Sequence, residues 1–450
     1  MKRAERRIER RVEWITLGLL CFGVAAKAIS WWSESAPRLP ASDNHWVMPK
    51  PDFLEVAPVC DRAAGSLPDP KRPAGKPDSS IPIEHFIIAT QENHSFDSYF
   101  GRLSDSRYYG KEVDGISKEY FNQDKQGKNV FAYHETSRCT ADPAHDWQAM
   151  LYYWNAGKND RFAMHNSKQV MAYYEDTDLP YYYALANEFA ISDRFFAPVL
   201  SQTFPNRFFL MAGTAFGHLY NDTPQDQNQF AQKTIFDVLD QFGVTWAFYG
   251  NPTESYLKLF LPLYRRSKGK VRTLEDYNRD LKNSTLPSVV FLESRNWEED
   301  EHPVAEVGAG EAWIKARLDS LMASSLWRTS AFLLTYDENG GFFDHVSPPL
   351  ACAPGDVKTE SSAQRDLFSR YGFRTPFVAA SPFARRHFVS HQVNDLTSVL
   401  KLIETKFNLP ALTQRDANAN NLLELFDFSH AHTEVPHFPD SKFRAGKKCE

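Results

Sequence analysis

Five short, continuously apolar runs constrain the fold of this chain more than any other feature. They lie at 83–90 (IEHFIIAT), 243–249 (GVTWAFY), 286–292 (LPSVVFL), 330–336 (SAFLLTY) and 375–381 (TPFVAAS). Because their apolar residues are consecutive rather than alternating, each strand is predicted to be buried on both faces. Segments 310–324 and 394–407 have apolar residues at helical spacing. Together these patterns predict an α/β fold with a largely parallel central sheet between helix layers.

Residues 1–28 have the pattern of a secretory signal. A basic stretch, MKRAERRIERRVE, is followed by the apolar WITLGLLCFGVAA, and AKA at 26–28 supplies a cleavage site between small residues. An uncleaved membrane anchor is the alternative, since two tryptophans just beyond this site could extend the apolar run to an interface. We therefore expect an exported protein, periplasmic or secreted, that is either free or anchored through this segment.

The rest of the chain divides into three parts. Residues 29–82 form a proline-rich extension, in which ten prolines between 33 and 82 exclude regular helix or central strand. Residues 83–428 contain the alternating strand and helix patterns and are predicted to be the domain that carries the chemistry. Residues 429–450 have the composition of a tail.

The composition excludes some classes of protein. The 450 residues are 42% hydrophobic, enough for a large core, and the formal net charge of −6 does not suit a nucleic-acid-binding protein. Apart from Cys21 in the apolar N-terminal run, the cysteines are Cys60, Cys139, Cys352 and Cys449. They are too widely spaced for a zinc site and allow three disulfide pairings, among which the sequence does not choose. Four unpaired buried thiols are the alternative.

Two of the predicted strands end in oxygen-rich side chains. The first runs into Glu92-Asn93, and the fourth runs into Asp337-Glu338, followed by two glycines that permit a tight turn. Functional groups gather at the carboxyl ends of strands in such sheets. Carboxylate and carboxamide oxygens suit a divalent cation, Ca²⁺, Mg²⁺, Mn²⁺ or Zn²⁺, whose identity the sequence leaves open. Two separate solvated turns are the alternative.

A candidate nucleophile lies in APVLSQTFPNRFFLMAGT (197–214). Pro205 suits the first turn of a helix and places Thr203 close to the N-cap, where the helix dipole favours a phosphate. A metal bound to the hydroxyl would lower its pKa and make it a nucleophile. Simple helix capping is the alternative role for Thr203, and Ser201 is the other hydroxyl near this turn.

Three histidines follow or precede acidic residues in predicted loops. They are His145 in ADPAHDWQAM, His302 in EEDEHPVAE and His345 in GGFFDHVSPP. A histidine beside a transferring phosphoryl group can hold its oxygens or protonate the leaving alcohol, whereas each one alone could equally be structural. Tyrosine-rich runs at 152–154, 173–174 and 181–183 could line a pocket for an apolar leaving group or pack in the core.

These segments resemble a known family. QENHSFDSYFG, AHDW, DLPYYYALANEFAISDRFF, TFPNRFF, EHP, TYDENGGFFDHVSPP and TPFVAASPF occur in the same order as blocks of the phosphoesterase family that includes bacterial phospholipases C and acid phosphatases. The resemblance runs from about Ile83 to Phe428. It implies the three-layer sandwich of alkaline-phosphatase-like proteins.

The resemblance also implies roles for individual residues. Thr203 would be the metal-bound nucleophile, attacking in line to form a phosphothreonine intermediate that water then hydrolyses. Asn206, in the same block, would have a structural or phosphate-orienting role. The implied metal ligands are Glu92, Asn93, Asp337 and Glu338, and the residues implied to surround the phosphate are His145, His302 and His345.

Three positions depart from the family pattern. His94 replaces an arginine, Ser98 replaces a histidine, and Leu396 replaces the histidine of a D-H-T-S block. If the substrate preference differs from that of relatives, the positions beside the metal are the first expected cause. Ser95 and Asp97 are assigned to holding the turn rather than to chemistry.

The predicted function is that of an exported, metal-dependent phosphoric-ester hydrolase resembling phospholipase C. An acid phosphatase of the same family, cleaving monoesters, is the first alternative. A sulfatase or phosphotransferase is less favoured, since Thr203 in TFPNR cannot form the formylglycine of sulfatases. The third alternative is a catalytically inactive binding protein of the cell envelope. The expected partner is a small-molecule or lipid phosphoester, with peripheral membrane contact, no nucleic acid and an open oligomeric state.

Overall fold

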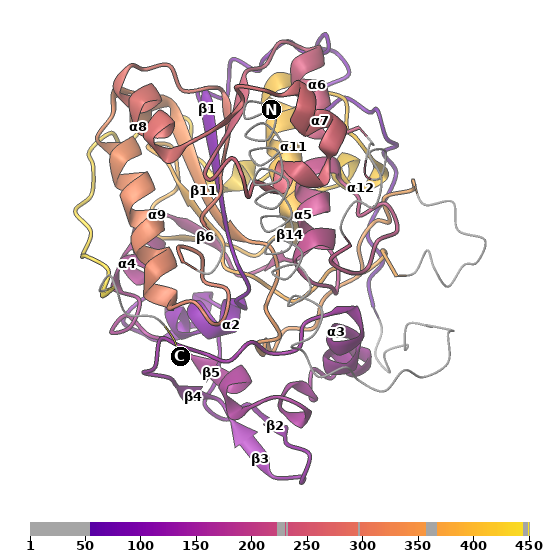
Figure 1. Ribbon diagram of the computed structural model, residues 1–450, viewed down its shortest axis with the longest axis vertical. Coiled ribbons are helices and arrows are strands. Elements are labelled where there is room, and N and C mark those ends of the chain that lie inside the picture. The colour runs from indigo at the N-terminus through magenta and orange to yellow at the C-terminus, as the bar shows by residue number, and fades with distance from the viewer. Residues whose placement is uncertain are drawn as a thin grey trace, which may run out of the picture. The chain divides into compact units, whose positions relative to one another are not determined.

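The computed structural model describes residues 55–222, 230, 233–295, 298–356, 367–443 and 449 (Figure 1). The predicted signal segment and the first part of the proline-rich extension lie outside these residues. Within the described part, no helix has both the length and the apolar character needed to cross a membrane.

An eight-stranded sheet forms the centre of the structure, in the order β13-β6-β12-β11-β1-β10-β8-β9. Only β12 runs against its neighbours, β11 and β6, and the other pairings in the sheet are parallel. Its strands are β1 (His85–Gln91), β6 (Ala190–Ser192), β8 (Trp246–Tyr249), β9 (Val271–Arg272), β10 (Val289–Leu292), β11 (Ser330–Tyr336), β12 (Val378–Ala380) and β13 (Phe388–Ser390).

Helices cover both faces of this sheet. In Figure 1, α8 and α9 lie on one side of the strands and α5 and α11 lie on the other. The helices are α2 (Phe96–Tyr99), α3 (Trp147–Trp154), α4 (Pro180–Glu188), α5 (Thr203–Ala212), α6 (Ile235–Gln241), α7 (Leu261–Arg266), α8 (Leu274–Lys282), α9 (Val307–Met322), α11 (Leu396–Phe407) and α12 (Gln414–Ala417). The predicted α/β class, with a largely parallel sheet between helix layers, is confirmed.

The apolar runs account for the central strands. All seven residues of β11 are buried, as are six of the seven in β1, because helices pack on both faces. All five predicted strands are present, and β8, β10 and β12 each begin three residues later than predicted. The short strands β6, β9 and β13 were not predicted, since two or three residues give no periodicity to detect.

Among the described residues, three two-stranded sheets lie outside the central sheet. They pair β2 (Phe121–Gln123) with β3 (Asn129–Phe131), β4 (Tyr133–His134) with β5 (Ala172–Tyr173), and β7 (Phe195–Phe196) with β14 (Asn394–Asp395). The β2–β3 pair is an antiparallel hairpin, and it projects at the lower end of Figure 1, the end to which β1 runs before α2.

Two disulfides cross-link the chain, Cys60 to Cys352 and Cys139 to Cys449. This is one of the three pairings that the sequence allowed. Two disulfides are typical of a protein that folds outside the reducing cytoplasm. The described part of the N-terminal extension also hydrogen-bonds to the end of α11, where Asp78 N donates to Lys406 O at 2.6 Å.

Candidate active site

The parallel pairing of β1 with β11 brings the two oxygen-rich turns together. Their last paired residues are Gln91 and Tyr336, so the next residues on each strand emerge side by side. Asn93 N donates to Asp337 Oδ1 at 3.3 Å, and all four predicted metal ligands are buried. The turns also touch through Gly340, where an added Cβ would lie 2.2 Å from Asn93 O, so only glycine fits there.

Thr203 is the first residue of α5, and it is buried. Its Oγ1 lies 3.5 Å from Glu92 Oε2. Asn206 holds the preceding loop in place: its side-chain Oδ1 accepts from Val199 N at 3.0 Å, and its Nδ2 donates to Ser201 O at 2.9 Å. The contacts of Asn206 are therefore with the backbone that positions Thr203.

Ser201, the other hydroxyl of this turn, faces a different partner. Its Oγ donates to Leu219 O at 2.6 Å, whereas Thr203 Oγ1 faces the carboxylate of Glu92. Of the two hydroxyls, Thr203 is the one placed at the strand ends.

Arg207 and Tyr256 hold Glu92, and sequence reasoning gave neither a site role. Arg207 Nη2 donates to Glu92 Oε1 at 2.8 Å, and Arg207 Nε donates to Asp337 Oδ2 at 3.2 Å. The Tyr256 hydroxyl also donates to Glu92 Oε1, and the Arg207 guanidinium stacks 4.2 Å from the Tyr256 ring. Because both donors use Oε1, the second carboxylate oxygen of Glu92 remains directed toward Thr203. The spacing of Arg207, four residues after Thr203 on α5, was the available signal.

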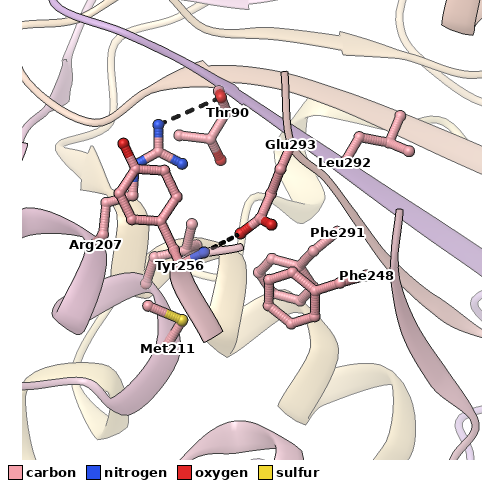
Figure 2. A pocket seen from close by; sticks show the side chains of 9 residues that line it. Thr90, Arg207, Met211, Phe248, Tyr256, Phe291, Leu292 and Glu293 are labelled. Atoms are coloured by element: carbon pink, nitrogen blue, oxygen red, sulfur yellow. Dashed lines mark hydrogen bonds between the residues drawn. The ribbon is translucent and has the colours of Figure 1, made fainter. Parts of the chain in front are cut away.

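A small cavity of about 10 Å³ lies behind this arrangement (Figure 2). It has room for about one water molecule and none for a phosphoester substrate. Glu293 lines it and accepts from Tyr256 N at 3.1 Å, and burial raises the pKa of Glu293 to about 7. Glu293 therefore supports the backbone of Tyr256, and Thr90 and Arg207 also line the cavity.

Two of the three predicted histidines lie together beside the strand ends. The ring centroids of His145 and His302 are 5.8 Å apart. His145 Nε2 lies 3.7 Å from Glu338 Oε1 and 3.4 Å from Asn93 Nδ2. Burial opposes protonation of His145, but the carboxylates of Glu338 and Asp142 outweigh it and raise its pKa to about 9.

His345 instead lies in a second cluster of charges. Its Nδ1 is 2.7 Å from Asp97 Oδ2, and its Nε2 is 2.9 Å from Asp114 Oδ1. The buried Arg374 guanidinium bridges Asp97 at 3.0 Å and Asp344 at 2.9 Å in the same cluster. Both ring nitrogens of His345 are thus engaged by carboxylates, and its hydrogen bonds tie it to this cluster rather than to His145 and His302.

The three departures from the family pattern pack within the protein. His94 is buried between the rings of Phe342 and Tyr99, 4.5 and 4.3 Å from their centroids, and burial lowers its pKa to about 3. The hydroxyl of Ser98 donates to a backbone carbonyl three residues earlier at 2.9 Å. Leu396 is buried as the first residue of α11.

The tyrosine-rich runs pack in the core instead of lining a pocket. Tyr173, Tyr174 and all of 181–183 are buried. The hydroxyl of Tyr182 donates to Glu301 Oε1 at 2.6 Å, and Tyr336 donates to the other oxygen. Burial raises the pKa of Glu301 to about 8, although these hydrogen bonds act in the opposite direction.

The strand-end residues fit a divalent cation by their donor atoms. Within the described residues, Asn93 Oδ1 and Glu338 Oε1 are buried and have no hydrogen-bond partner, which is costly unless a cation coordinates them. Glu92 contributes the oxygen that faces Thr203. All are oxygen donors, the set that hard divalent cations prefer.

The same residues are not drawn into a tight cluster around one point. Among the described residues, the groups of three whose ligand atoms all lie within 4.8 Å of one another are Asp142–His145–His302 and Asp97–Asp344–His345. Glu92 and Asp337 are instead both paired with the Arg207 guanidinium, which satisfies one oxygen of each.

A family profile and two curated relatives identify the family of this chain. The phosphoesterase family profile matches residues 83–410. Phospholipase C B of Mycobacterium tuberculosis is 29% identical over 438 residues, covering 84% of this chain and 82% of that protein. Non-specific phospholipase C1 of Arabidopsis thaliana is 31% identical over 382 residues, covering 77% and 71%. A solved structure in the alkaline phosphatase superfamily from Vibrio parahaemolyticus covers 83% of this chain and 75% of its own, with a TM-score of 0.41 and 11% identity.

Proposed function

This chain belongs to the phosphoesterase family, and from that premise we propose that it is an exported, metal-dependent enzyme resembling phospholipase C, with Thr203 as its nucleophile. It is a hydrolase that acts on phosphoric esters. The observation that carries the finer proposal is the position of the buried Thr203 hydroxyl, 3.5 Å from Glu92 at the joined ends of β1 and β11.

The strand-end residues would hold the cation. When bound, a divalent ion supplies positive charge that lowers the pKa of a neighbouring hydroxyl and offsets the charge of the phosphoryl oxygens. Arg207 and Tyr256 would hold the carboxylate of Glu92 in place for this purpose. The proposed ligands are Glu92, Asn93, Asp337 and Glu338.

The reaction would proceed in two displacements at phosphorus. Thr203 Oγ1 forms a bond to phosphorus while the bond to the alcohol oxygen breaks on the opposite side, and the hydroxyl proton is lost to solvent. The product of this step is a phosphothreonine and the released alcohol, which gains a proton. Water then attacks phosphorus, restores the threonine hydroxyl and releases the phosphate product.

His145 and His302 suit the side of the site next to Glu338. Their imidazoles, 5.8 Å apart, can donate to phosphoryl oxygens and can deliver the proton that the departing alcohol needs. Asn206 fixes the loop before Thr203, so its proposed role is to position the nucleophile. His345 is proposed to act through the ion-pair cluster that it shares with Asp97.

The relatives named phospholipase C favour a phosphodiester substrate over a monoester. The test is a comparison of p-nitrophenyl phosphorylcholine with p-nitrophenyl phosphate, with Ca²⁺, Mg²⁺, Mn²⁺ or Zn²⁺ supplied in turn. We expect faster hydrolysis of the diester, whereas a preference for the monoester at acid pH would favour the acid phosphatase alternative. Hydrolysis of neither ester under any of these conditions would favour the envelope binding protein, and a sulfate ester cleaved in their place would favour a sulfatase.

Thr203→Ala tests the nucleophile, with Ser201→Ala as the matched control. Loss of the attacking oxygen should reduce kcat by about a thousandfold or more. Ser201→Ala removes only a hydrogen bond to Leu219 O and should keep most of the activity. Unchanged hydrolysis by Thr203→Ala would refute the assignment.

Export is proposed from the predicted signal and is supported by the two disulfides. A cell-fractionation experiment with a tagged full-length chain tests it. Recovery in the periplasm, the medium or the outer side of the membrane is the expected result, and recovery in the cytoplasm with free thiols would contradict it.

A further inference from the structure

The outer face of the β2–β3 hairpin carries a pair of exposed aromatic rings. Phe121 of β2 and Phe131 of β3 are directly opposite each other in the ladder, with ring centroids 5.3 Å apart. Their exposed fractions are 45% and 50%, and the adjacent Tyr120 is 37% exposed. Large apolar side chains that gather on one surface, instead of being scattered, mark an interaction site.

The other face of the hairpin is anchored to the protein. Because side chains alternate along a strand, Asn122 points opposite to Phe121 and is buried. Its Oδ1 accepts from Phe162 N at 2.6 Å, and its Nδ2 donates to Asn159 O at 3.1 Å. The exposed pair therefore sits on a fixed support, and its exposure does not come from a frayed segment.

Basic residues surround the aromatic pair. The stretch 118–131 holds three lysines and two acidic residues, in a chain whose formal net charge is −6. Asp124 is one of the two, and its carboxylate accepts from the backbone N–H groups of Gln126 and Lys128 in the hairpin turn. The three exposed lysines are Lys118, Lys125 and Lys128. Aromatic rings beside lysines are typical of surfaces that enter the headgroup region of a lipid bilayer.

The hairpin is in direct contact with the segment that carries half of the candidate site. The Tyr120 ring stacks on the His345 ring at 4.9 Å and lies 6.4 Å from the Phe343 ring. Both residues follow Asp337 and Glu338 on the same segment within eight residues. In Figure 1 the hairpin projects at the end of the structure to which β1 runs, which is the end where the site residues emerge.

We propose that the β2–β3 hairpin docks the enzyme on a phospholipid surface, with Phe121 and Phe131 inserted among the headgroups and the lysines contacting lipid phosphates. The proposal rests on the proposed function, because a lipid phosphoester would then be held in its own bilayer beside the site. Docking and catalysis use different residues, so the two can be separated by experiment.

The experiment measures vesicle binding and soluble hydrolysis in the same proteins. Sedimentation with phosphatidylcholine vesicles, with and without phosphatidylglycerol, reports docking in the presence of a chelator, which prevents turnover. Hydrolysis of p-nitrophenyl phosphorylcholine reports catalysis without any bilayer. The test variant is Phe121→Ser/Phe131→Ser, and Val435→Ser, also exposed but in the C-terminal part, is the matched control.

We expect the double variant to bind vesicles about 10- to 100-fold more weakly, with soluble hydrolysis and melting temperature close to those of the unchanged protein. Val435→Ser should bind as the unchanged protein does. Lys118→Gln/Lys125→Gln/Lys128→Gln should lose the extra binding that phosphatidylglycerol confers and should make the remaining binding less sensitive to salt.

Three results would overturn the proposal. The first is equal vesicle binding by the unchanged protein and the double variant. The second is that the unchanged protein does not bind vesicles. This includes the case in which analytical ultracentrifugation shows that the unchanged protein is a dimer and the double variant a monomer. The third is equal loss in the Val435→Ser control. If the double variant alone loses binding but no variant hydrolyses the soluble ester, docking is supported and the proposed function fails.

Discussion

Arg207 holds Glu92 through a buried ion pair, with Nη2 at 2.8 Å from Oε1, while its Nε reaches Asp337 Oδ2 at 3.2 Å. The Tyr256 hydroxyl donates to the same Glu92 oxygen. One side chain from α5 therefore connects the ends of β1 and β11, and the other oxygen of Glu92 faces the hydroxyl of Thr203, the proposed nucleophile. Residues that orient metal ligands matter to a metal site as much as the ligands themselves, and Arg207 and Tyr256 have that position beside the proposed ligand Glu92.

Tyr256→Phe should weaken metal binding about tenfold, because Glu92 loses one of the two donors that fix its carboxylate. Isothermal titration with each divalent cation measures the affinity directly. Tyr264→Phe is the control, since it removes a hydroxyl whose bond is to Pro252 O, at 3.0 Å. Equal affinity in the unchanged protein and Tyr256→Phe would show that Arg207 alone orients Glu92.

Glu338→Gln should raise the melting temperature of the metal-free protein and abolish the further rise on adding metal. Burial raises the pKa of Glu338 well above its usual value; His145 opposes this rise without cancelling it, and the Asp337 carboxylate adds to it, so the charge of Glu338 is unfavourable without a bound metal ion. A bound ion stabilises the fold by mass action, and that gain is lost with the ligand. Thermal melts of the unchanged protein and the variant, each with and without metal, test both expected changes in melting temperature. A metal-induced rise that persists in the variant would exclude Glu338 as a ligand.

His302→Ala should lower the catalytic rate, whereas His345→Ala should lower the stability of the fold. His302 lies beside His145, so its loss should lower kcat about 100-fold with little change in melting temperature. His345 pairs with two carboxylates, so its loss should cost on the order of 3 kcal/mol in the free energy of unfolding. Steady-state kinetics and urea unfolding make the comparison, with exposed His430→Ala as the control.

A stable His345→Ala protein with a large loss of kcat would contradict this division and place His345 at the phosphate.

The ion pairs of His345 also make the stability of the protein depend on pH. Burial opposes its protonation, but Asp97 and Asp114 raise its pKa to about 9. Their contribution to stability is fully present below the unfolded pKa of about 6.5 and is lost as the pH rises through about 9.

Glu301→Gln should flatten the dependence of stability on pH. Burial raises the pKa of Glu301 from 4.5 to about 8, so the folded protein keeps a proton that the unfolded chain loses. The stability from this group is complete below pH 4.5 and disappears as the pH rises through about 8. Between these limits, the unfolding free energy of the unchanged protein should fall by on the order of 5 kcal/mol through this group, and the variant should lose that part of the pH dependence. Urea unfolding at several pH values measures it, with exposed Glu275→Gln as the control.

If the free energy of unfolding changes with pH equally in Glu301→Gln and in the unchanged protein, Glu301 is ionised in the core. The tyrosines around it would then be stabilising a buried charge, because Tyr182 and Tyr336 both donate to its oxygens.

The sequence was sufficient for the central strands because each is long enough and apolar enough to need burial on both faces. The meeting of Glu92 with Asp337 was also within reach, since parallel strands end at one edge of a sheet. The antiparallel direction of β12 could not be predicted from the sequence. It depends on how the chain connects β12 to its neighbours β11 and β6, and no local feature of TPFVAAS indicates it.

The side chains that surround the proposed metal ligands were harder to predict from the sequence. Tyr256 lies 164 residues from Glu92 in sequence, and no motif links the two positions. His345 looked like His145 because both lie beside an aspartate, but only the fold shows that Asp97 and Asp114 occupy both of its nitrogens. Contacts made by one hydrogen bond between distant segments leave no periodic signal in the chain.

The two disulfides enclose overlapping stretches of the chain, 60–352 and 139–449. A single cut in the backbone at any point between Cys60 and Cys449 falls inside at least one of these stretches. The two fragments therefore stay covalently joined, and they would separate on a denaturing gel only after reduction. With the export proposed above, one nick by an extracellular protease in a surface loop need not release any part of the catalytic domain.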